Sequence, residues 1–327
     1  MNEQELNNRS KRVLSLLFKT LTWLLAAGCF YWVYSKIAGA AAKENISAWR
    51  YLLDFFGEAN WLLWLSVMIP YSVFFFLVDS NVTWRVLRWF NAPELKYGNV
   101  LPIRASAYIL SLVNEQVGKG AMSLYLLKTY EVPGWKALSS MIFIGVCEIY
   151  QLLLFSSVGL IVFFGYVQQA STALPLDFIL PGVFIFAFVY FPFHLAYFRG
   201  HIFKEFKLRD ISVLHALREA KFHHYVLTIL FKAPNMIGAV FVYTVALAVF
   251  NVQANTGQML VFLPLIFLAA ALPLPFHAGA LVIWTVVFPD YPEVGAFSLV
   301  MHTFFVIFNA LIGVCFLPRA NNELFDQ

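Results

Sequence analysis

Two long apolar stretches of this chain are each interrupted once, and the two interruptions are alike. Residues 101–128 are apolar up to the sequence NEQVGKG at 114–120 and then resume. Residues 258–288 are apolar up to the sequence PLPFHAG at 273–279 and then resume. A lipid bilayer tolerates non-helical backbone only where protein buries it or a watery cavity solvates it. Interrupted segments at corresponding places in two halves of a membrane protein therefore point to a binding site.

The composition predicts an integral membrane protein. Hydrophobic residues make up 61% of the 327 residues and charged residues only 12%, whereas a soluble domain has about 25% charged residues. Several apolar runs reach the ~20 residues that a membrane-crossing helix needs. The net charge of +4 is spread over many loops, without the basic block interleaved with aromatic residues that would predict a nucleic-acid partner. Cys29, Cys147 and Cys315 lie inside apolar runs and do not indicate a disulfide framework.

Six segments are predicted to cross the membrane completely. The first is interpreted as an anchor helix rather than a removed signal peptide, because it is long and lacks a small-residue cleavage site. The stretch 46–56, after that helix, has the pattern of an amphipathic helix lying on the membrane surface. The predicted crossings are 13–36, 61–84, 138–165, 178–198, 225–250 and 295–317.

Lysine and arginine in the loops predict the orientation of these crossings. Basic residues are concentrated in cytoplasmic loops, and three of them precede the first crossing, which predicts a cytoplasmic N-terminus. Segment 199–224 carries six Lys and Arg residues, whereas 166–177 and 251–257 carry none. Full crossings at both interrupted segments would place 199–224 outside. We therefore expect each interrupted segment to enter the membrane and return as a re-entrant hairpin, and both chain termini to be cytoplasmic.

On this interpretation the two hairpins enter from opposite faces. Each is flanked by a crossing on either side, in 61–165 and again in 225–317. This is the layout of an inverted-topology repeat, with 178–198 linking the halves and 13–36 as an added helix. We expect residues 1–327 to form one all-α polytopic membrane domain with about six transmembrane helices and two re-entrant helical hairpins.

The first interruption supplies candidate binding residues. Asn114, Glu115 and Lys119 lie at predicted membrane depth, where polar and ionisable groups are rare and mark functional sites by default. A second half-helix starting near Gly118 would present free backbone N–H groups to a phosphate or carboxylate. The alternative is that Glu115 and Lys119, at positions i and i+4, only neutralise each other.

Three further residues are candidates at membrane depth. His277, in the second interruption, could bind a headgroup or a proton, or could simply cap the loop through a hydrogen bond. Glu148 is expected to face a cavity and to pair with Lys119 or Lys232, the alternative being a buried, protonated carboxyl. Lys232 is interpreted as extending its ammonium group to the inner membrane surface.

Arg85, Arg88 and Trp89 are predicted to lie at the inner membrane interface. Arginine and tryptophan there usually anchor a helix among headgroups, and arginine also binds phosphate bidentately. The chain has no Gly-rich phosphate loop, zincin motif or nucleophile elbow. We therefore expect no enzymatic activity, no cofactor and no metal site.

Loose motifs in this chain resemble a known family. The resemblance is to the lysylphosphatidylglycerol synthase transmembrane-region family, the flippase domain of bacterial multiple peptide resistance proteins and their stand-alone relatives, over roughly residues 61–317. The motifs that carry it are RW at 88–89, AYILSLVN at 107–114 with Gly118, YLL at 125–127, VPGWKAL at 132–138 leading to Glu148, LPLP at 272–275 with Gly279, and Gly313.

The resemblance implies site roles for Asn114, Glu148, Pro273 and Gly279. It does not carry over the charge pattern, because Lys119 follows Gly118 where the family usually has an acidic residue. It implies a flippase or transporter of the bacterial inner membrane that moves a phospholipid or polyprenyl-linked headgroup between leaflets. The alternative is a scaffold that binds such a lipid for a partner glycosyltransferase or other envelope enzyme. A third possibility, a headgroup-modifying enzyme, lacks an identifiable nucleophile.

Overall fold

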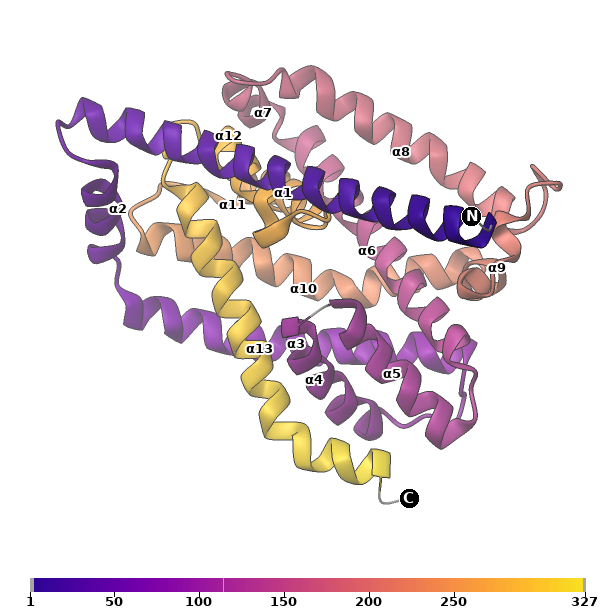
Figure 1. The fold of residues 1–327 in the computed structure, drawn as a ribbon. Helices are drawn as coiled ribbons and strands as arrows, with labels where there is room; N and C mark the ends of the chain where they lie inside the picture. The colour runs from indigo at the N-terminus through magenta and orange to yellow at the C-terminus, as the bar shows by residue number, and fades with distance from the viewer. Residues whose placement is uncertain (1–2, 114, 326–327) are drawn as a thin grey trace.

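Long apolar helices make up most of the described part of the chain (Figure 1). The computed structural model describes residues 3–113 and 115–325, and these residues form helices without any strand. Six of the helices in this part are long and apolar enough to cross a membrane. This confirms the prediction of an all-helical chain and supports a multi-pass membrane protein. The six are α1 (Glu3–Lys43), α3 (Trp61–Phe90), α6 (Gly134–Val162), α8 (Leu176–Phe198), α10 (Phe222–Val249) and α13 (Val294–Phe325).

Two boundaries refine the predicted segments. The crossing expected at 138–165 ends at Val162, because Phe163 leaves the helical conformation and a short helix, α7 (Phe164–Ala170), follows. The amphipathic helix expected at 46–56 is α2 (Ala48–Gly57). Its N-cap is Ser47, whose side-chain oxygen accepts a hydrogen bond from the backbone N–H of Arg50 at 3.2 Å. A capping serine of this kind satisfies one of the free donors at a helix start.

Each interrupted segment forms two helices that pack against each other. The first consists of α4 (Tyr97–Val113) and α5 (Glu115–Tyr130), separated at Asn114, which lies outside the described residues. The second consists of α11 (Thr256–Ala270), the short 3₁₀ turn η3 (Pro275–His277) and α12 (Ala278–Val287). In the second break Phe276 and His277 have positive φ angles of 55° and 51°, a conformation that costs a non-glycine residue on the order of 1–3 kcal/mol.

The basic segment 199–224 folds back against the start of α6. It contains η1 (Lys207–Asp210), η2 (Ser212–Leu214) and α9 (His215–Glu219). The backbone N–H of Ala216 donates to the Ser139 side-chain oxygen at 2.6 Å. This contact attaches the segment to the body of the protein.

Two apolar cores lie at opposite ends of the long helices. Along α3, Trp64, Met68 and Tyr71 belong to the core that contains α11 and α12. Val82 and Val86 of the same helix belong to the core that contains α4 and α5. The helix residues between these two sets include buried polar groups, and α6 and α10 follow the same pattern. We call this polar section the middle layer; it is formed by residues 72–80 of α3, 104–108 of α4, 148–151 of α6 and 228–235 of α10.

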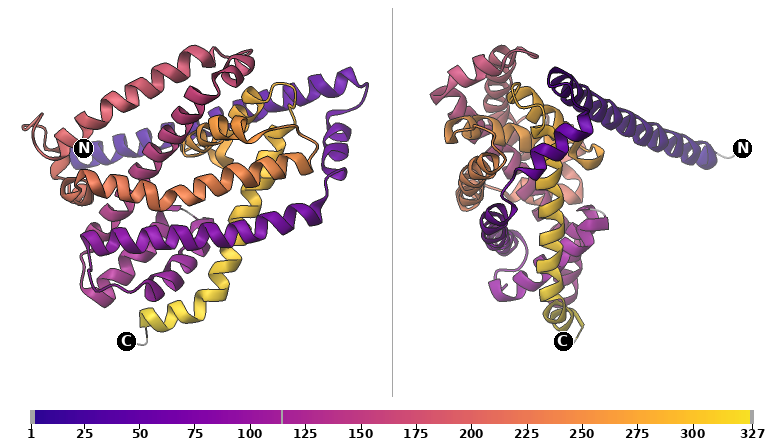
Figure 2. Two further views of the ribbon diagram at one scale, coloured as in Figure 1. Left: turned by 180° about the vertical axis from the view of Figure 1, so that it is seen from behind. Right: turned by 90° about the vertical axis from the view of Figure 1, so that its left-hand side faces the viewer.

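Helix α1 stands apart from the other helices. It packs mainly against α12 and α2, with a smaller contact to η3, and its N-terminal half leans away from the body of the protein (Figure 2). Only 6% of its apolar span is buried. The exposed ring of Phe276, in the second break, makes edge contacts with Trp23 and Phe30 of α1. The added helix is therefore joined to the second interrupted segment.

Candidate functional site

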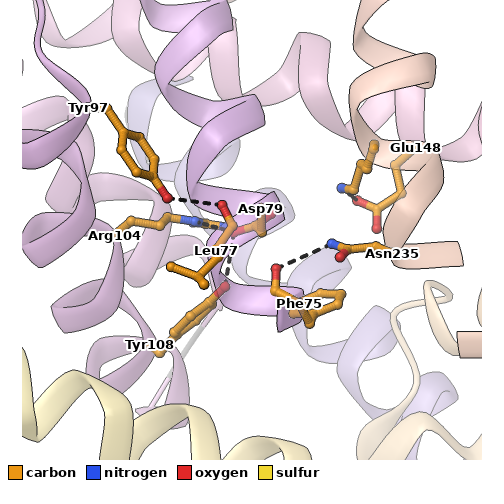
Figure 3. Close-up of polar contacts among 9 residues, drawn as sticks. Phe75, Leu77, Asp79, Tyr97, Arg104, Tyr108, Glu148 and Asn235 are labelled. Atoms are coloured by element: carbon orange, nitrogen blue, oxygen red, sulfur yellow. Dashed lines mark hydrogen bonds and ion pairs between the residues drawn. The ribbon is translucent and has the colours of Figure 1, made fainter. Parts of the chain in front are cut away.

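The middle layer contains a buried ion pair between α3 and α4. Arg104 Nε donates to Asp79 Oδ2 at 2.7 Å, and the side chains of the two residues are 17% and 6% exposed. The Tyr108 hydroxyl donates to the same carboxylate oxygen at 2.9 Å. Figure 3 shows both side chains of α4 directed at Asp79. The Asp79 carboxylate is thereby paired and hydrogen-bonded, as a charge inside a membrane span requires.

The local sequence explains this arrangement. Arg104 and Tyr108 are four residues apart, so that they lie one above the other on the same face of α4. Tyr97, nearly two turns earlier on α4, donates its hydroxyl to the Leu77 carbonyl of α3 at 3.2 Å. Three side chains of one helix thus bond to neighbouring residues of the other. These contacts fix the position of α4 against α3.

A second ion pair joins α6 and α10 in the same layer. Lys232 Nζ lies 2.9 Å from Glu148 Oε2. The lysine side chain is only 7% exposed, whereas the glutamate side chain is 47% exposed. The interpretation that Lys232 extends to the membrane surface is therefore wrong, because α6 provides a buried partner. The pairing of Glu148 with Lys232 was one of the two alternatives considered for Glu148.

The two ion pairs interact electrostatically with each other. The positive charge of Lys232 attracts the Asp79 carboxylate, and the negative charge of Glu148 attracts the Arg104 guanidinium. Two acids and two bases balance, so the layer has no net charge when all four are ionised. The layer can therefore offer an ammonium group and a half-exposed carboxylate to a polar ligand without a large uncompensated charge.

Amide and hydroxyl groups complete the layer. Asn235, one turn after Lys232, donates from Nδ2 to the Phe75 carbonyl at 3.3 Å (Figure 3), and the backbone carbonyl of Asn235 accepts from the Tyr71 hydroxyl at 3.0 Å. Five buried polar atoms of this layer have no hydrogen-bond partner within the part of the chain that the structure describes: Ser72 Oγ, Ser80 Oγ, Ser106 Oγ, Gln151 Nε2 and Asn235 Oδ1. Unsatisfied buried polar groups are rare in folded proteins and call for a ligand or a water as partner.

The candidate residues of the first interruption lie outside what the structure describes. Asn114 itself is not described, and neither are the side chains of Glu115 and Lys119 or the surroundings of Gly118. Their predicted roles therefore stay predictions. Their neighbours on α4 and α5 pack in the second apolar core, which borders the middle layer.

The second interruption is described fully, and it gives its residues structural contacts. Pro273 is exposed in the turn between α11 and η3. The ring nitrogen Nδ1 of His277 lies 2.7 Å from the carbonyl oxygen of Ala270, which is the last residue of α11. Because a carbonyl only accepts, Nδ1 carries the proton, and the histidine satisfies a free acceptor at the helix end. The structure thus contains the capping hydrogen bond that one alternative for His277 predicted. The ring also lies 4.1 Å from the ring of His302 of α13.

Gly279 has a packing role in the second hairpin. A Cβ atom at this position would lie 2.7 Å from the Ala269 carbonyl oxygen, closer than real Cβ contacts. A side chain there would push α12 away from α11. The contacts of His277 and Gly279 are with Ala269, Ala270 and Leu272 at or just after the end of α11 and with His302 of α13, and none of them involves the ion pairs of the middle layer.

Arg85, Arg88 and Trp89 lie together at the C-terminal end of α3. With Trp84 and Pro93 they line a pocket of about 330 Å³. The prediction grouped these residues but did not predict a pocket, because its far wall comes from the turn after the helix.

Sequence reasoning missed Asp79, Arg104 and Tyr108. Asp79 lies in an apolar run of α3 and Arg104 in the apolar part of α4. Ionisable residues inside apolar segments are functional candidates by default, and this signal was sufficient to select both. Within the described residues no group of three or more His, Cys, Asp and Glu side chains is arranged to hold a metal ion.

Comparison of the chain with protein-family models, with curated proteins and with solved structures finds no match.

Proposed function

We propose that this protein moves a phospholipid or lipid-linked headgroup between the leaflets of a bacterial cytoplasmic membrane, with both chain termini cytoplasmic. The observation that carries the proposal is the middle layer, in which the Asp79–Arg104 and Glu148–Lys232 pairs lie between two apolar cores. Charges at this depth are costly and mark substrate or ion pathways. A headgroup would pass this layer while its acyl chains stay in the bilayer.

The packing of the helices supports an inverted repeat, in which α3, α4, α5 and α6 correspond to α10, α11, α12 and α13. The first helix of each half packs against the other, α3 against α10. The first hairpin helix of each half packs against the last helix of the other half: α4 against α13, and α11 against α6. Two equivalent halves related by a two-fold axis would make these contacts. Transporters of this type place their substrate between the halves.

Two glycines add to this correspondence. A Cβ atom on Gly159 of α6 would lie 2.8 Å from the Val261 backbone of α11, and one on Gly313 of α13 would lie 2.6 Å from the Ala105 carbonyl of α4. The last helix of each half thus has a glycine where the hairpin of the other half comes closest. Small residues permit such close helix packing in membranes.

The groups of the middle layer suit a headgroup that carries both charges. The ammonium of Lys232 could bind a phosphate, and the half-exposed Glu148 carboxylate could bind an amine or hydroxyl of the same headgroup. Gln151 Nε2 could donate a hydrogen bond to a remaining headgroup oxygen, and Asn235 Oδ1 could accept one from a headgroup amine or hydroxyl. A bound headgroup would replace the ion pair between Lys232 and Glu148, so that each side chain would contact the lipid in place of the other.

The test is lipid translocation by the purified chain in liposomes. A fluorescent phospholipid is added to both leaflets, and the fraction that a membrane-impermeant reductant bleaches reports movement between them. We expect Glu148→Gln and Lys232→Gln to slow movement roughly tenfold or more, because a hydrogen bond to a charged group contributes about 1.5–3 kcal/mol. The matched control is Arg50→Gln, which removes an exposed ion pair with Asp54 on α2.

Four outcomes would count against the proposal. Wild-type rates equal to those of protein-free liposomes would remove it, and unchanged rates in both variants would remove the middle layer as the path. An equal loss in Arg50→Gln would show a general effect of charge. Absence of movement together with co-purification of a glycosyltransferase would favour the scaffold alternative.

A further inference from the structure

The pocket at the end of α3 has two arginines in its wall. Trp84, Arg85, Arg88, Trp89 and Pro93 line it, and we call it the arginine pocket. The turn after α3 folds back over the helix end, where the Trp84 ring nitrogen donates to the Leu95 carbonyl at 2.7 Å. This hydrogen bond holds the turn, which includes Pro93, against the helix end.

Both guanidinium groups are held in place through one nitrogen. Arg88 Nε donates to the Pro93 carbonyl at 2.8 Å, and Arg85 Nε donates to Asn81 Oδ1 at 2.9 Å. The Arg85 guanidinium also lies 4.0 Å above the ring of Phe231, and that of Arg88 lies 5.1 Å above the ring of Trp84. Aromatic faces favour a cation at such distances. Among the described residues, the two Nη atoms of each arginine have no hydrogen-bond partner.

The two arginines of the pocket form no ion pair within the part of the chain that the structure describes. Among the described residues no carboxylate lies within ion-pair distance of Arg85 or Arg88. The groups that hold their Nε atoms, an amide and a backbone carbonyl, are neutral. Two oriented guanidinium groups with free Nη atoms match the oxygens of a phosphate, which arginine binds bidentately.

We propose that the arginine pocket binds the phosphate of an anionic phospholipid headgroup. The lipid source, as opposed to free phosphate, rests on the proposed function, whereas the oxyanion chemistry rests on the pocket alone. Arg88 is exposed and Arg85 is half-buried. A headgroup would therefore contact Arg88 at the protein surface and Arg85 deeper in the pocket. Trp89, stacked on His224 with ring centroids 5.2 Å apart, lies beside the headgroup, where tryptophan is favoured at a membrane interface.

The test is calorimetric binding to the purified full chain in a neutral detergent. The probes are dihexanoyl-phosphatidylglycerol, inorganic phosphate and dihexanoylglycerol, which lacks the phosphate. We expect the phospholipid to bind, and Arg85→Gln and Arg88→Gln each to weaken its binding roughly tenfold, as for loss of a charge-assisted hydrogen bond. The control is Lys96→Gln, which removes one exposed positive charge from the same turn without lining the pocket.

The outcomes separate the sources of the ligand. Binding of the phospholipid but not of inorganic phosphate supports the lipid headgroup, whereas equal binding of both assigns the pocket to free phosphate and overturns the lipid part. Equal binding of dihexanoylglycerol, unchanged binding by the double arginine variant, or an equal loss in Lys96→Gln overturns the proposal. If the variants do not fold, phospholipid affinity of the wild-type chain that is insensitive to salt also overturns it. These measurements need no transport and stay decisive if lipid translocation fails.

Discussion

Arg104 Nε donates to Asp79 Oδ2 at 2.7 Å across the contact of α4 with α3, and both side chains are largely buried. The Tyr108 hydroxyl donates to the same oxygen. A buried ion pair adds little to stability compared with apolar residues of similar size, but removal of one partner leaves an uncompensated charge. The contact therefore fixes where α4 lies rather than providing most of the stability of the fold.

Replacing one member of this pair should destabilise the protein far more than replacing both. We expect Asp79→Leu to cost about 3–5 kcal/mol, because Arg104 is then buried without a counter-charge, and the double variant Asp79→Leu/Arg104→Leu to recover most of this loss. Thermal unfolding in detergent measures both. The exposed pair of Arg50 and Asp54 on α2 is the control; Asp54→Leu should cost less than about 1 kcal/mol. A double variant as unstable as Asp79→Leu would contradict this account.

Close helix packing at two glycines gives a second prediction. Gly159→Ala and Gly313→Ala should each destabilise the protein by about 1–3 kcal/mol, because the new Cβ atom would overlap the backbone of α11 or α4. Thermal unfolding of the purified variants measures this.

The matched control lies on the same helix as Gly159. A Cβ atom on Gly145 would meet nothing within 4 Å, and Gly145→Ala should therefore leave stability unchanged or raise it by up to about 1 kcal/mol through helix propensity. Equal losses in Gly145→Ala and Gly159→Ala would mean that backbone freedom, not packing, determines the effect.

The long apolar helices could be predicted from the sequence because a membrane span depends mainly on the length of an apolar run. The two breaks could also be found, since proline, glycine and polar residues interrupt those runs. The partners of charged residues could not. Lys232 lies in the interior of α10, and the position of its ammonium group depends on Glu148 of α6, more than 80 residues away in the chain. Because α6 packs against α10, the buried Glu148–Lys232 pair is lower in free energy than Lys232 extended to the membrane surface.

The missed pair Asp79–Arg104 has a different cause. Each residue alone was visible in an apolar segment, but α4 was expected to start at 101 and starts at Tyr97. The additional turn adds Tyr97 to the side of α4 that contacts α3, where Arg104 and Tyr108 also lie. Sequence periodicity does not determine which side of a short helix faces a neighbour when most of its residues are apolar.

The hydrogen bond of His277 allows its structural and transport roles to be separated. His277→Ala should destabilise the second break by about 1–3 kcal/mol, because the Ala270 carbonyl loses its donor. His277→Asn should be close to wild type in stability, since asparagine tolerates a positive φ and its amide can donate in place of Nδ1. Thermal unfolding measures both variants.

Lipid movement by His277→Asn then distinguishes the alternatives. A capping role predicts wild-type translocation, whereas a role in proton or headgroup binding predicts a loss despite normal stability. An asparagine variant as unstable as the alanine variant would show that the bond to Ala270 is not what holds the break.

The contact between Tyr51 and Glu293 should make stability depend on pH. The Tyr51 hydroxyl donates to Glu293 Oε2 at 3.0 Å, joining α2 to the turn before α13. Burial raises the pKa of the Glu293 carboxyl above its ordinary value of 4.5, and the charge of Glu44 acts in the same direction, against the opposing effect of the hydrogen bonds. The folded state therefore binds this proton more tightly than the unfolded state. The protonated Glu293 carboxyl contributes fully to stability below pH 4.5, and this contribution is lost as pH rises through the raised pKa.

Thermal unfolding across this pH window tests the linkage. We expect Glu293→Gln, whose amide oxygen still accepts the Tyr51 hydrogen bond, to remove this decline and to be more stable than wild type at neutral pH. Tyr51→Phe is the control for the hydrogen bond itself: without the donor that favours the charged form, the pKa of Glu293 rises further and the decline persists to higher pH. An identical pH profile for wild type and Glu293→Gln would show that another group titrates, because only the carboxyl has been replaced.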